Sequence, residues 1–338
     1  MNWLDEPVVV WGAGAMGGSV GASLIRAGRS VVLVDTDDAH AAAIREHGLR
    51  VTGPVDDFTV SAYCAHPDSL DPGLMTVLLA VKAHHTEAAL AAIEPRLADD
   101  GCVVSVQNGL NELVIAERIG VERTVGCFVN FGADVVEPGV IARGNRGAVV
   151  VGELDGALTV RVRAVHELLG IVEPDAVLTD NIWGYLWSKL AYGSMLFATA
   201  LTDASIADVL DSSEHRPLLI GLAREAIAVA AARGVRVEAF DGFDPAAFAP
   251  GVPEADAHAS LDALVRFNRG SAKTHSGVWR DLAVRKRRTE VDAQIAPVAA
   301  LGAEAGVDTP LTRRLVALVH DVEEGRRKQG WESLDALQ

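Results

Sequence analysis

The hydrophobic pattern of the chain changes character about half-way along it. From Val8 onward, short runs of β-branched and aliphatic residues alternate with longer alanine-rich segments in which apolar residues recur at helical spacing. The apolar runs are VVVW (8–11), VVLVD (31–35), MTVLLAV (75–81) and CVVSVQ (102–107). Continuous apolar strands separated by amphipathic helices are typical of a parallel sheet covered on both faces. The first half therefore predicts an α/β domain of the doubly wound, Rossmann type.

Later segments depart from this rhythm. Residues 49–63 predict a short hairpin at an edge of the sheet, and residues 124–154 contain further strands separated by turns, which favours an antiparallel or mixed edge. Beyond residue 180 the β-branched runs stop, and alanine- and leucine-rich helical patterns continue to the C-terminus. We expect a dinucleotide-binding Rossmann domain over residues 1–178 and an all-helical domain over residues 179–338.

A single charged side chain, Lys189, lies in the middle of the apolar segment NIWGYLWSKLAYGSMLFATALT (181–202). The segment is long enough to span a bilayer, but a lysine at the centre of a membrane helix costs about 2.5 to 3.5 kcal/mol. It predicts instead a buried helix of a globular domain. An ammonium that loses hydration among apolar groups must be paired, solvated in a cavity or used in chemistry.

Composition excludes several classes of function. The chain has 338 residues, 49% hydrophobic and 22% charged, which is enough for one or two packed cores. A net charge of −16 opposes long contacts with a nucleic acid or an anionic membrane, so neither is expected as a partner. The three cysteines form no CxxC pair and suggest neither a disulfide framework nor a zinc site. With an acidic N-terminal segment unlike a signal peptide, they predict a cytoplasmic protein.

The strongest local motif is VVVWGAGAMGGSV, in which Gly12, Gly14 and Gly17 match G-x-G-x-x-G after an expected strand and at the start of an expected helix. Gly12 permits the tight turn, Gly14 lets a pyrophosphate approach the backbone, and Gly17 lets the helix lie close to the strand. This context predicts dinucleotide binding; a glycine turn that binds nothing is the alternative. The expected cofactor-binding residues of this loop are Gly12, Ala13, Gly14, Ala15, Met16 and Gly17.

The end of the second strand indicates which dinucleotide is preferred. Asp35 follows the loop by about twenty residues, where an acidic side chain can accept hydrogen bonds from the ribose hydroxyls of NAD(H). No arginine adjoins it in sequence to neutralise a 2′-phosphate, so we expect NAD(H) to be preferred; NADP(H) is the alternative cofactor if Arg45 reaches that phosphate. Asp35 and the acidic residues after it can also cap the helix that follows.

Seven stretches of the chain, taken in order, resemble one known family. They are GAGAMG, VKAHHTEAAL (81–90), QNGLNE (107–112), EPGVIARG (137–144), GELDG (152–156), LWSKLAY (186–192) and RRTEVDAQIAPV (287–298). From Val8 to about Val319 the chain thus resembles the ketopantoate reductases, or 2-dehydropantoate 2-reductases. The resemblance implies an active site in the cleft between a Rossmann domain and a helical domain. It also implies reduction of a small α-keto acid by a nicotinamide cofactor in pantothenate biosynthesis, and a homodimer.

The resemblance assigns roles to individual residues. The lysine of the family's VKA motif corresponds to Lys82 and the asparagine of its QNG motif to Asn108, both beside cofactor and substrate in the family. Its catalytic lysine corresponds to Lys189 and its substrate-binding glutamate to Glu290. Hydride addition to a ketone creates an alkoxide, which needs a proton or a cation, so a lysine suits this position chemically. The alternatives are a snorkelling side chain for Lys189 and ordinary turn packing for Lys82 and Asn108.

The chain departs from the family at the expected substrate site. Typical members have asparagines four and eight residues after the catalytic lysine, on the same helix face, and this chain has Gly193 and Phe197 there. The change predicts a larger and drier pocket for a different carbon skeleton. A serine pair of the family is reduced to Ser276, which we expect to hold the substrate carboxylate together with Asn108.

The stretch THSGVWRDLAVRKRR (274–288) leaves its alignment to the family open, because the spacing from Asp281 to Glu290 is one residue longer than typical. His275 or Arg280 could bind a carboxylate there, or the stretch could be a basic helix facing solvent. No metal site is expected, because the adjacent histidines at positions 84 and 85 lack ligand partners at suitable spacing.

The leading hypothesis is therefore an NAD(P)H-dependent reductase of a small α-keto acid, with 2-dehydropantoate as the default substrate. Lys189 would donate the proton, Glu290 would orient a substrate hydroxyl or amine, and Asn108 and Ser276 would hold the carboxylate. Two alternatives stay open: an oxidoreductase of a different carbonyl or hydroxy-acid compound, and a dinucleotide-sensing regulator without turnover. A regulator needs neither Lys189 nor Glu290, which favours the enzyme.

Overall fold

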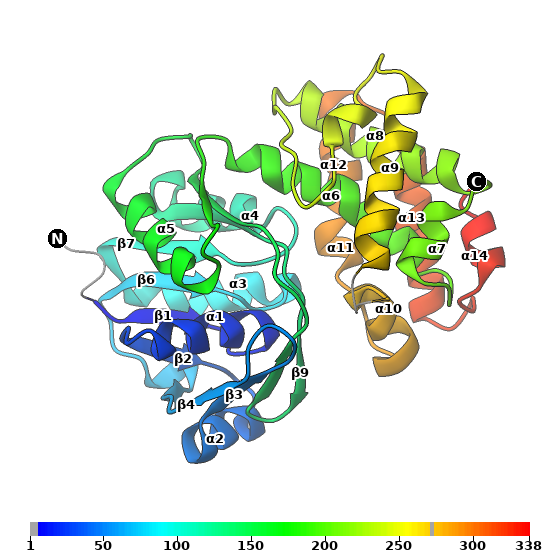
Figure 1. Cartoon of the computed structure of the whole chain (residues 1–338). Coiled ribbons are helices and arrows are strands. Elements are labelled where there is room, and N and C mark those ends of the chain that lie inside the picture. Colours follow the sequence, from blue (N-terminus) through cyan, green and yellow to red (C-terminus); the bar gives the residue numbers. More distant parts are fainter. Residues whose placement is uncertain (1–5, 271–273) are drawn as a thin grey trace. The chain divides into compact units, whose positions relative to one another are not determined.

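The computed structural model describes residues 6–270 and 274–338 and divides into two compact units, Met1–Ile182 and Trp183–Gln338 (Figure 1). Throughout those two described ranges, every strand belongs to the first unit and the second unit is built from helices. The change from strands to helices falls between β12 (Val177–Leu178) and α6 (Ile182–Thr199). An α/β unit followed by a helical unit confirms the fold class expected from the hydrophobic pattern.

The main sheet of the first unit has eight strands. In spatial order they are β12, β11 (Val149–Glu153), β8 (Thr124–Val129), β7 (Leu97–Ser105), β6 (Leu74–Leu79), β1 (Val8–Trp11), β2 (Val31–Val34) and β5 (Cys64–Ala65). All neighbours are parallel except β11 and β8. In the central strand, Val10 pairs with Leu33 on one side and Leu78 on the other. The loops after β1, β2, β6 and β7 therefore meet at one edge, where open α/β sheets bind their ligands.

Alternate residues of β1 enter two different cores, one on each face of the sheet. Val8 and Val10 belong to one core and Val9 and Trp11 to the other. The first core includes residues from α1 (Ala15–Arg26), α2 (Asp38–His47) and α5 (Val160–Val172), and the second includes residues from α3 (Thr86–Ile93) and α4 (Asn111–Ile119). Helices lie on both faces of this sheet (Figure 1), and the central strand β1 is therefore apolar and buried along its whole length.

A second, four-stranded sheet forms in the same unit. Its order is β4 (Phe58–Val60), β3 (Leu49–Thr52), β10 (Val140–Arg143) and β9 (Ala133–Glu137). The hairpin expected at an edge of the main sheet is β3 and β4, and that placement was wrong, because β3 pairs in parallel with β10 instead. The reason is packing: Leu49, Val51 and Ile141 are at most 1% exposed and share a core with α1. A Cβ on Gly18 of α1 would lie 2.3 Å from Cδ1 of Ile141.

The second unit consists of helices around the apolar segment that contains Lys189. They are α6, α7 (Ile206–Asp211), α8 (Arg216–Ala232), α9 (Glu254–Arg269), α10 (Gly277–Arg280), α11 (Val291–Gln294), α12 (Ala296–Ala305), α13 (Pro310–Glu323) and α14 (Trp331–Asp335). Large side chains of α6, among them Leu186, Trp187 and Leu190, are at most 3% exposed. Within the described part of the chain, no helix is both long enough and apolar enough to cross a membrane.

Candidate functional site

The turn between β1 and α1 requires glycine at two of its three motif positions. Gly12 has φ +100°, and a Cβ on it would lie 2.9 Å from the backbone nitrogen of Val81. A Cβ on Gly17 would lie 2.0 Å from the carbonyl oxygen of Gly12. The backbone N–H of Gly12 donates to the carbonyl of Val34 at 2.8 Å, which fixes the turn against β2. Backbone crowding therefore explains Gly12 and Gly17 without any ligand.

Gly14 has a different environment. A Cβ on Gly14 would meet no atom within 4 Å, so the space beside it is open. Gly14 is the N-cap of α1, and the first turn of that helix, which begins with Ala15 and Met16, has no acidic side chain. A helix N-terminus offers unpaired N–H groups and a partial positive charge. An open space in front of such a terminus fits the pyrophosphate of a dinucleotide.

Asp35 is bound to the glycine loop. Its Oδ2 accepts the backbone N–H of Ala13 at 2.8 Å, and its Oδ1 accepts the N–H of Asp37 at 2.9 Å. The cap of α2 is the side chain of Asp37, which accepts the N–H of His40, so Asp35 itself does not cap the helix. Arg45 donates from Nη1 to the carbonyl of Cys64 at 2.8 Å. The carboxylate thus has a fixed position beside the loop.

His40 is a further contact to this loop that sequence analysis missed. The side chain is 4% exposed; Nε2 lies 3.0 Å from the carbonyl of Ala13 and Nδ1 lies 3.1 Å from the backbone nitrogen of Gly139. A carbonyl only accepts and an N–H only donates, so the ring is neutral with its proton on Nε2. His40 thereby joins the glycine loop to the turn between β9 and β10. Its position five residues after Asp35 is the only hint in the sequence.

Lys82 and Asn108 follow neighbouring strands at the same edge of the sheet. Lys82 is half-buried and precedes the 3-10 turn η2 (Ala83–His85), and Asn108 is exposed in the loop between β7 and α4. The carbonyl of Asn108 accepts Nδ2 of Asn111 at 2.7 Å. The first unit therefore brings the glycine loop, Asp35, Lys82 and Asn108 to one edge. Over residues 6–270 and 274–338, no group of three His, Cys, Asp or Glu side chains is arranged to hold a metal ion.

In the second unit, Lys189 and Gly193 lie one turn apart in α6. Lys189 is half-buried between Ser188 and Leu190, both of which are buried. A Cβ on Gly193 would lie 3.9 Å from Cδ1 of Ile295 and would meet no other atom within 4 Å. This helix face therefore has room for a side chain where the family has an asparagine.

Glu290 begins a segment that reaches α6 from another part of the chain. It is half-buried at the start of α11, and its carbonyl accepts the N–H of Gln294 at 2.8 Å. Ile295 follows directly and faces Gly193 of α6. The second unit thus brings the segment that begins with Glu290 against the helix that contains Lys189, about a hundred residues earlier in the sequence.

Two of the expected substrate-binding residues are buried in the second unit. Phe197 is 1% exposed in the interior of the second unit. Ser276 is 3% exposed, and its hydroxyl accepts the backbone N–H of Trp279 at 3.1 Å as the N-cap of α10. The Ser276 hydroxyl is therefore already engaged as a helix cap.

Tyr192, which follows Lys189 by three residues in α6, belongs to an aromatic cluster that the sequence did not reveal. Its ring centroid lies 6.1 Å from that of Phe240 and 5.7 Å from that of Phe243. Nδ2 of Asn268 donates to its hydroxyl at 3.3 Å. Burial raises the pKa of Tyr192, so the side chain stays a neutral phenol near neutral pH.

The stretch with the longer spacing contains a helical irregularity. Residues Asp281–Arg285 form a π turn, in which the N–H of Lys286 donates to the carbonyl of Asp281. A π turn holds one more residue than an α turn, so it offers a place for the extra residue. Nη2 of Arg287 lies 2.8 Å from Oδ1 of Asp281. His275 stacks on Trp279 with ring centroids 4.1 Å apart.

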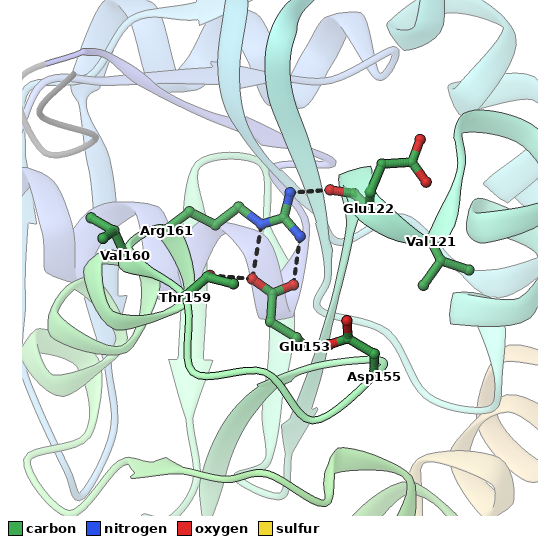
Figure 2. A pocket seen from close by; sticks show the side chains of 7 residues that line it. All are labelled: Val121, Glu122, Glu153, Asp155, Thr159, Val160 and Arg161. Carbon is green, nitrogen blue, oxygen red and sulfur yellow. Dashed lines mark hydrogen bonds and ion pairs between the residues drawn. The ribbon is translucent and has the colours of Figure 1, made fainter.

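Figure 2 shows a pocket of the first unit that is lined by other residues than those described above. Its lining is Val121, Glu122, Glu153, Asp155, Thr159, Val160 and Arg161. Arg161 donates from Nε and Nη2 to the two carboxylate oxygens of Glu153, at 2.9 and 2.6 Å. Glu153 pairs with Val125 at the start of β8, so this pocket lies at the opposite edge of the sheet from the glycine loop. The Arg161 guanidinium already donates to the Glu153 carboxylate and to the carbonyl of Glu122.

Two family profiles match the chain, one for each half. The profile described as Ketopantoate reductase PanE/ApbA matches residues 8–156, and its C-terminal counterpart matches residues 181–323. The chain belongs to the ketopantoate reductase family. It is accordingly an NAD(P)-dependent oxidoreductase that acts on a carbonyl or hydroxyl carbon. This confirms the family resemblance and the reaction class expected from the sequence.

Named relatives of the family cover nearly the whole chain. A 2-dehydropantoate 2-reductase of Mesorhizobium japonicum is 29% identical over 92% of this chain and 96% of its own length. A 2-dehydropantoate 2-reductase of Archaeoglobus fulgidus is 28% identical over 95% of this chain and 99% of its own length. Among solved structures, a PanE/ApbA family ketopantoate reductase from Ralstonia eutropha JMP134 has a TM-score of 0.79 at 24% identity, covering 95% and 99%. D-mandelate dehydrogenase with NADH and anilino(oxo)acetate has a TM-score of 0.82 at 23% identity, with the same coverage. The two structures establish the shared fold.

Proposed function

We propose that this ketopantoate reductase homologue reduces a small α-keto acid with NADH, with 2-dehydropantoate as the default substrate. In this proposal residues 1–178 bind the dinucleotide, and residues 179–338 bind the substrate and form a homodimer. The observation that supports it best is the open space at Gly14 in front of the α1 N-terminus, with Asp35 fixed beside the same loop. Family membership supplies the reaction class.

The residues of the chain have separate tasks in this reaction. A bound nicotinamide supplies the hydride. Lys189 holds a proton for the carbonyl oxygen and stabilises the negative charge that develops there. Glu290 orients a substrate hydroxyl or amine, and Asn108 holds the carboxylate together with Ser276. Ser276 would do so while its hydroxyl also caps α10.

The preference for NADH follows from the charge at the end of β2. A 2′-phosphate would lie close to the carboxylate of Asp35, which two backbone N–H groups hold in place. Arg45, the base that could neutralise such a phosphate, donates to the carbonyl of Cys64. Repulsion between like charges should therefore weaken NADPH binding relative to NADH.

A second candidate substrate class is favoured by Gly193. Where the family places an asparagine, the space beside Gly193 is open and the nearest side-chain atom is apolar. An α-keto acid with a larger apolar substituent, lacking the hydroxyl that such an asparagine would bind, suits that space. The reaction and the roles of Lys189 and Glu290 are the same for both classes.

The test is NADH consumption with a panel of α-keto acids that includes 2-dehydropantoate. We expect turnover of at least one, and a loss of about 10² to 10⁴ in kcat for Lys189→Ala, the range for a lost general acid. Lys328→Ala, at an exposed lysine of the second unit, is the matched control and should keep wild-type activity. NADH binding without turnover of any compound would favour the regulator, and wild-type activity of Lys189→Ala would refute the role of that lysine.

A further inference from the structure

A chain of hydrogen bonds through three buried side chains links the loop after β6 to the loop after β7. Nε2 of Gln107 donates to the carbonyl of Val81 at 2.8 Å and to Oγ1 of Thr86 at 2.9 Å. Oγ1 of Thr86 donates to Oδ1 of Asn111 at 3.0 Å, and Nδ2 of Asn111 donates to the carbonyl of Asn108 at 2.7 Å. Gln107, Thr86 and Asn111 are at most 7% exposed.

The two ends of this chain determine the orientation of every group between them. The carbonyls of Val81 and Asn108 can only accept, so the amide nitrogens of Gln107 and Asn111 must face them. Oδ1 of Asn111 then faces Thr86, whose hydroxyl donates to it and accepts from Gln107. Neither side-chain amide can flip without breaking a hydrogen bond of the network, so the network has one arrangement.

The residues at its two ends adjoin the proposed site. Val81 precedes Lys82, and the last acceptor is the backbone of Asn108 itself. The backbone of Val81 also lies against the glycine loop, since a Cβ on Gly12 would approach its nitrogen to 2.9 Å. The network thus connects three neighbouring loops of the sheet edge.

Stability alone gives a weak reason for these side chains. Oε1 of Gln107 is buried and has no hydrogen-bond partner in the part of the chain that the structure describes. A buried acceptor without a partner costs stability, and apolar side chains of the same shape would avoid that cost. A polar network that carries this cost in stability is suited to a site whose geometry must be held.

We propose that Gln107, Thr86 and Asn111 are positioning residues, which hold Lys82 and Asn108 at the distance and orientation that the reaction needs. The inference rests on the proposed function, because Lys82 and Asn108 matter only if cofactor and substrate bind there. Thr86 is the central link, since its hydroxyl accepts from Gln107 and donates to Asn111.

The test compares valine substitutions at two buried threonines. Thr86→Val keeps the shape and removes the link, while Thr124→Val removes an equally buried hydroxyl, which donates to Gly120 at the far edge of the sheet. We expect Thr86→Val to lower kcat/KM about tenfold, because small misplacements of reacting groups are costly. Thr124→Val should leave kcat/KM unchanged, although both variants should lose a similar amount of unfolding free energy. Thr86→Ser should restore most of the activity. Equal kcat/KM in the two valine variants would overturn the proposal.

A second measurement separates positioning from a structural role. If Thr86 acts through Lys82 or Asn108, its effect should shrink once that residue is already removed, because the effects of coupled residues are not additive. Thr86→Val should then lower kcat/KM less than about twofold in a Lys82→Ala or an Asn108→Ala background. A full tenfold loss in both backgrounds overturns the proposal. If Thr86→Val does not fold, Gln107→Met takes its place in both comparisons.

Failure of the proposed function can be distinguished from failure of the positioning role. A wild-type protein that turns over no α-keto acid disproves that function, and the same variants are then compared by their Kd for NADH. Weaker NADH binding in Thr86→Val than in Thr124→Val would still support the network as a positioning device. Equal Kd values would overturn it.

Discussion

Ala13 and Asp35 form a hydrogen bond of 2.8 Å between the backbone N–H of the first and Oδ2 of the second. This bond joins the glycine loop to the end of the adjacent strand β2. Asp35 is therefore part of the loop's own scaffold as well as a charge at the cofactor edge, and the two roles can be separated by substitution.

Asp35→Asn should relax the cofactor preference. The amide keeps one oxygen that can accept from Ala13, loses the acceptor for the N–H of Asp37, and removes the charge that repels a 2′-phosphate. We expect KM for NADPH to fall about tenfold, equivalent to about 1.4 kcal/mol, with a smaller change for NADH. Steady-state kinetics with both cofactors measures this. Asp38→Asn, at an exposed neighbour that also removes one charge, is the control; an equal effect there would show that overall charge and not Asp35 is responsible.

The glycine loop should respond in opposite ways to two alanine substitutions. Gly17→Ala places a Cβ 2.0 Å from a carbonyl oxygen and should destabilise the fold by about 3 kcal/mol. Gly14→Ala meets no protein atom within 4 Å and should change stability by less than about 0.5 kcal/mol while raising the Kd for NADH at least about tenfold. Urea unfolding and NADH titration distinguish the two. Unchanged NADH affinity in folded Gly14→Ala would contradict the proposed pyrophosphate position.

Substrate choice should change at Gly193. Gly193→Asn fits the open space, so it should lower kcat/KM about tenfold for α-keto acids with bulky apolar substituents and raise it for 2-dehydropantoate, whose hydroxyl the amide can bind. Gly170→Asn is the matched control, because Gly170 is also helical and half-buried and a Cβ there would meet no atom within 4 Å, but it lies in α5 of the first unit. Kinetics with both substrate classes should be unaffected there. The same loss of activity on every substrate would point to simple blockage of the site.

Alkaline pH should destabilise the protein through two buried thiols. Burial, with the Asp35 carboxylate also contributing, raises the pKa of Cys64 from 9.0 to about 11, and burial raises the pKa of Cys102 to about 12. Above pH 9 the unfolded chain loses protons that the folded chain keeps. The free energy of unfolding should therefore fall by up to about 1.4 kcal/mol per pH unit for each thiol between pH 9 and about pH 11.

Urea unfolding at pH 8, 9, 10 and 11 measures this dependence. Cys64→Ala and Cys102→Ala should each have a lower stability at pH 8 and a shallower decline above pH 9, because the titrating group is gone. A decline as steep as that of the wild type in both variants would assign the alkaline instability to other groups.

Local features of the first unit could be predicted from the sequence. The spacing of Gly12, Gly14 and Gly17 after an apolar strand, and of Asp35 after the next one, depends only on residues close in the chain. The contact of His40 with Gly139 could not be predicted, since it joins residues 99 positions apart and depends on how the second sheet packs. Likewise, pairing of β3 with β10 depends on the apolar face that both present to α1.

In the second unit, too, the features that depend on distant neighbours could not be predicted from the sequence. An ammonium within an apolar segment marked Lys189, and the structure places it half-buried in α6. The role of the Ser276 hydroxyl as a helix cap and the burial of Phe197 depend on neighbours that no local pattern specifies. The hydrogen-bond network through Thr86 was missed because a threonine at a helix start has many possible partners.

The second sheet can be completed only late in the synthesis of the first unit. β3 pairs with β4 on one side at once, but its other side waits for Val140–Arg143. At a translation rate of roughly 5 to 20 residues per second, that strand emerges from the ribosome roughly 4 to 18 s later. During this interval the nascent chain exposes an unpaired strand edge, the kind of surface that recruits other chains. A chaperone that shields the hairpin until β10 arrives would therefore raise the yield of native protein.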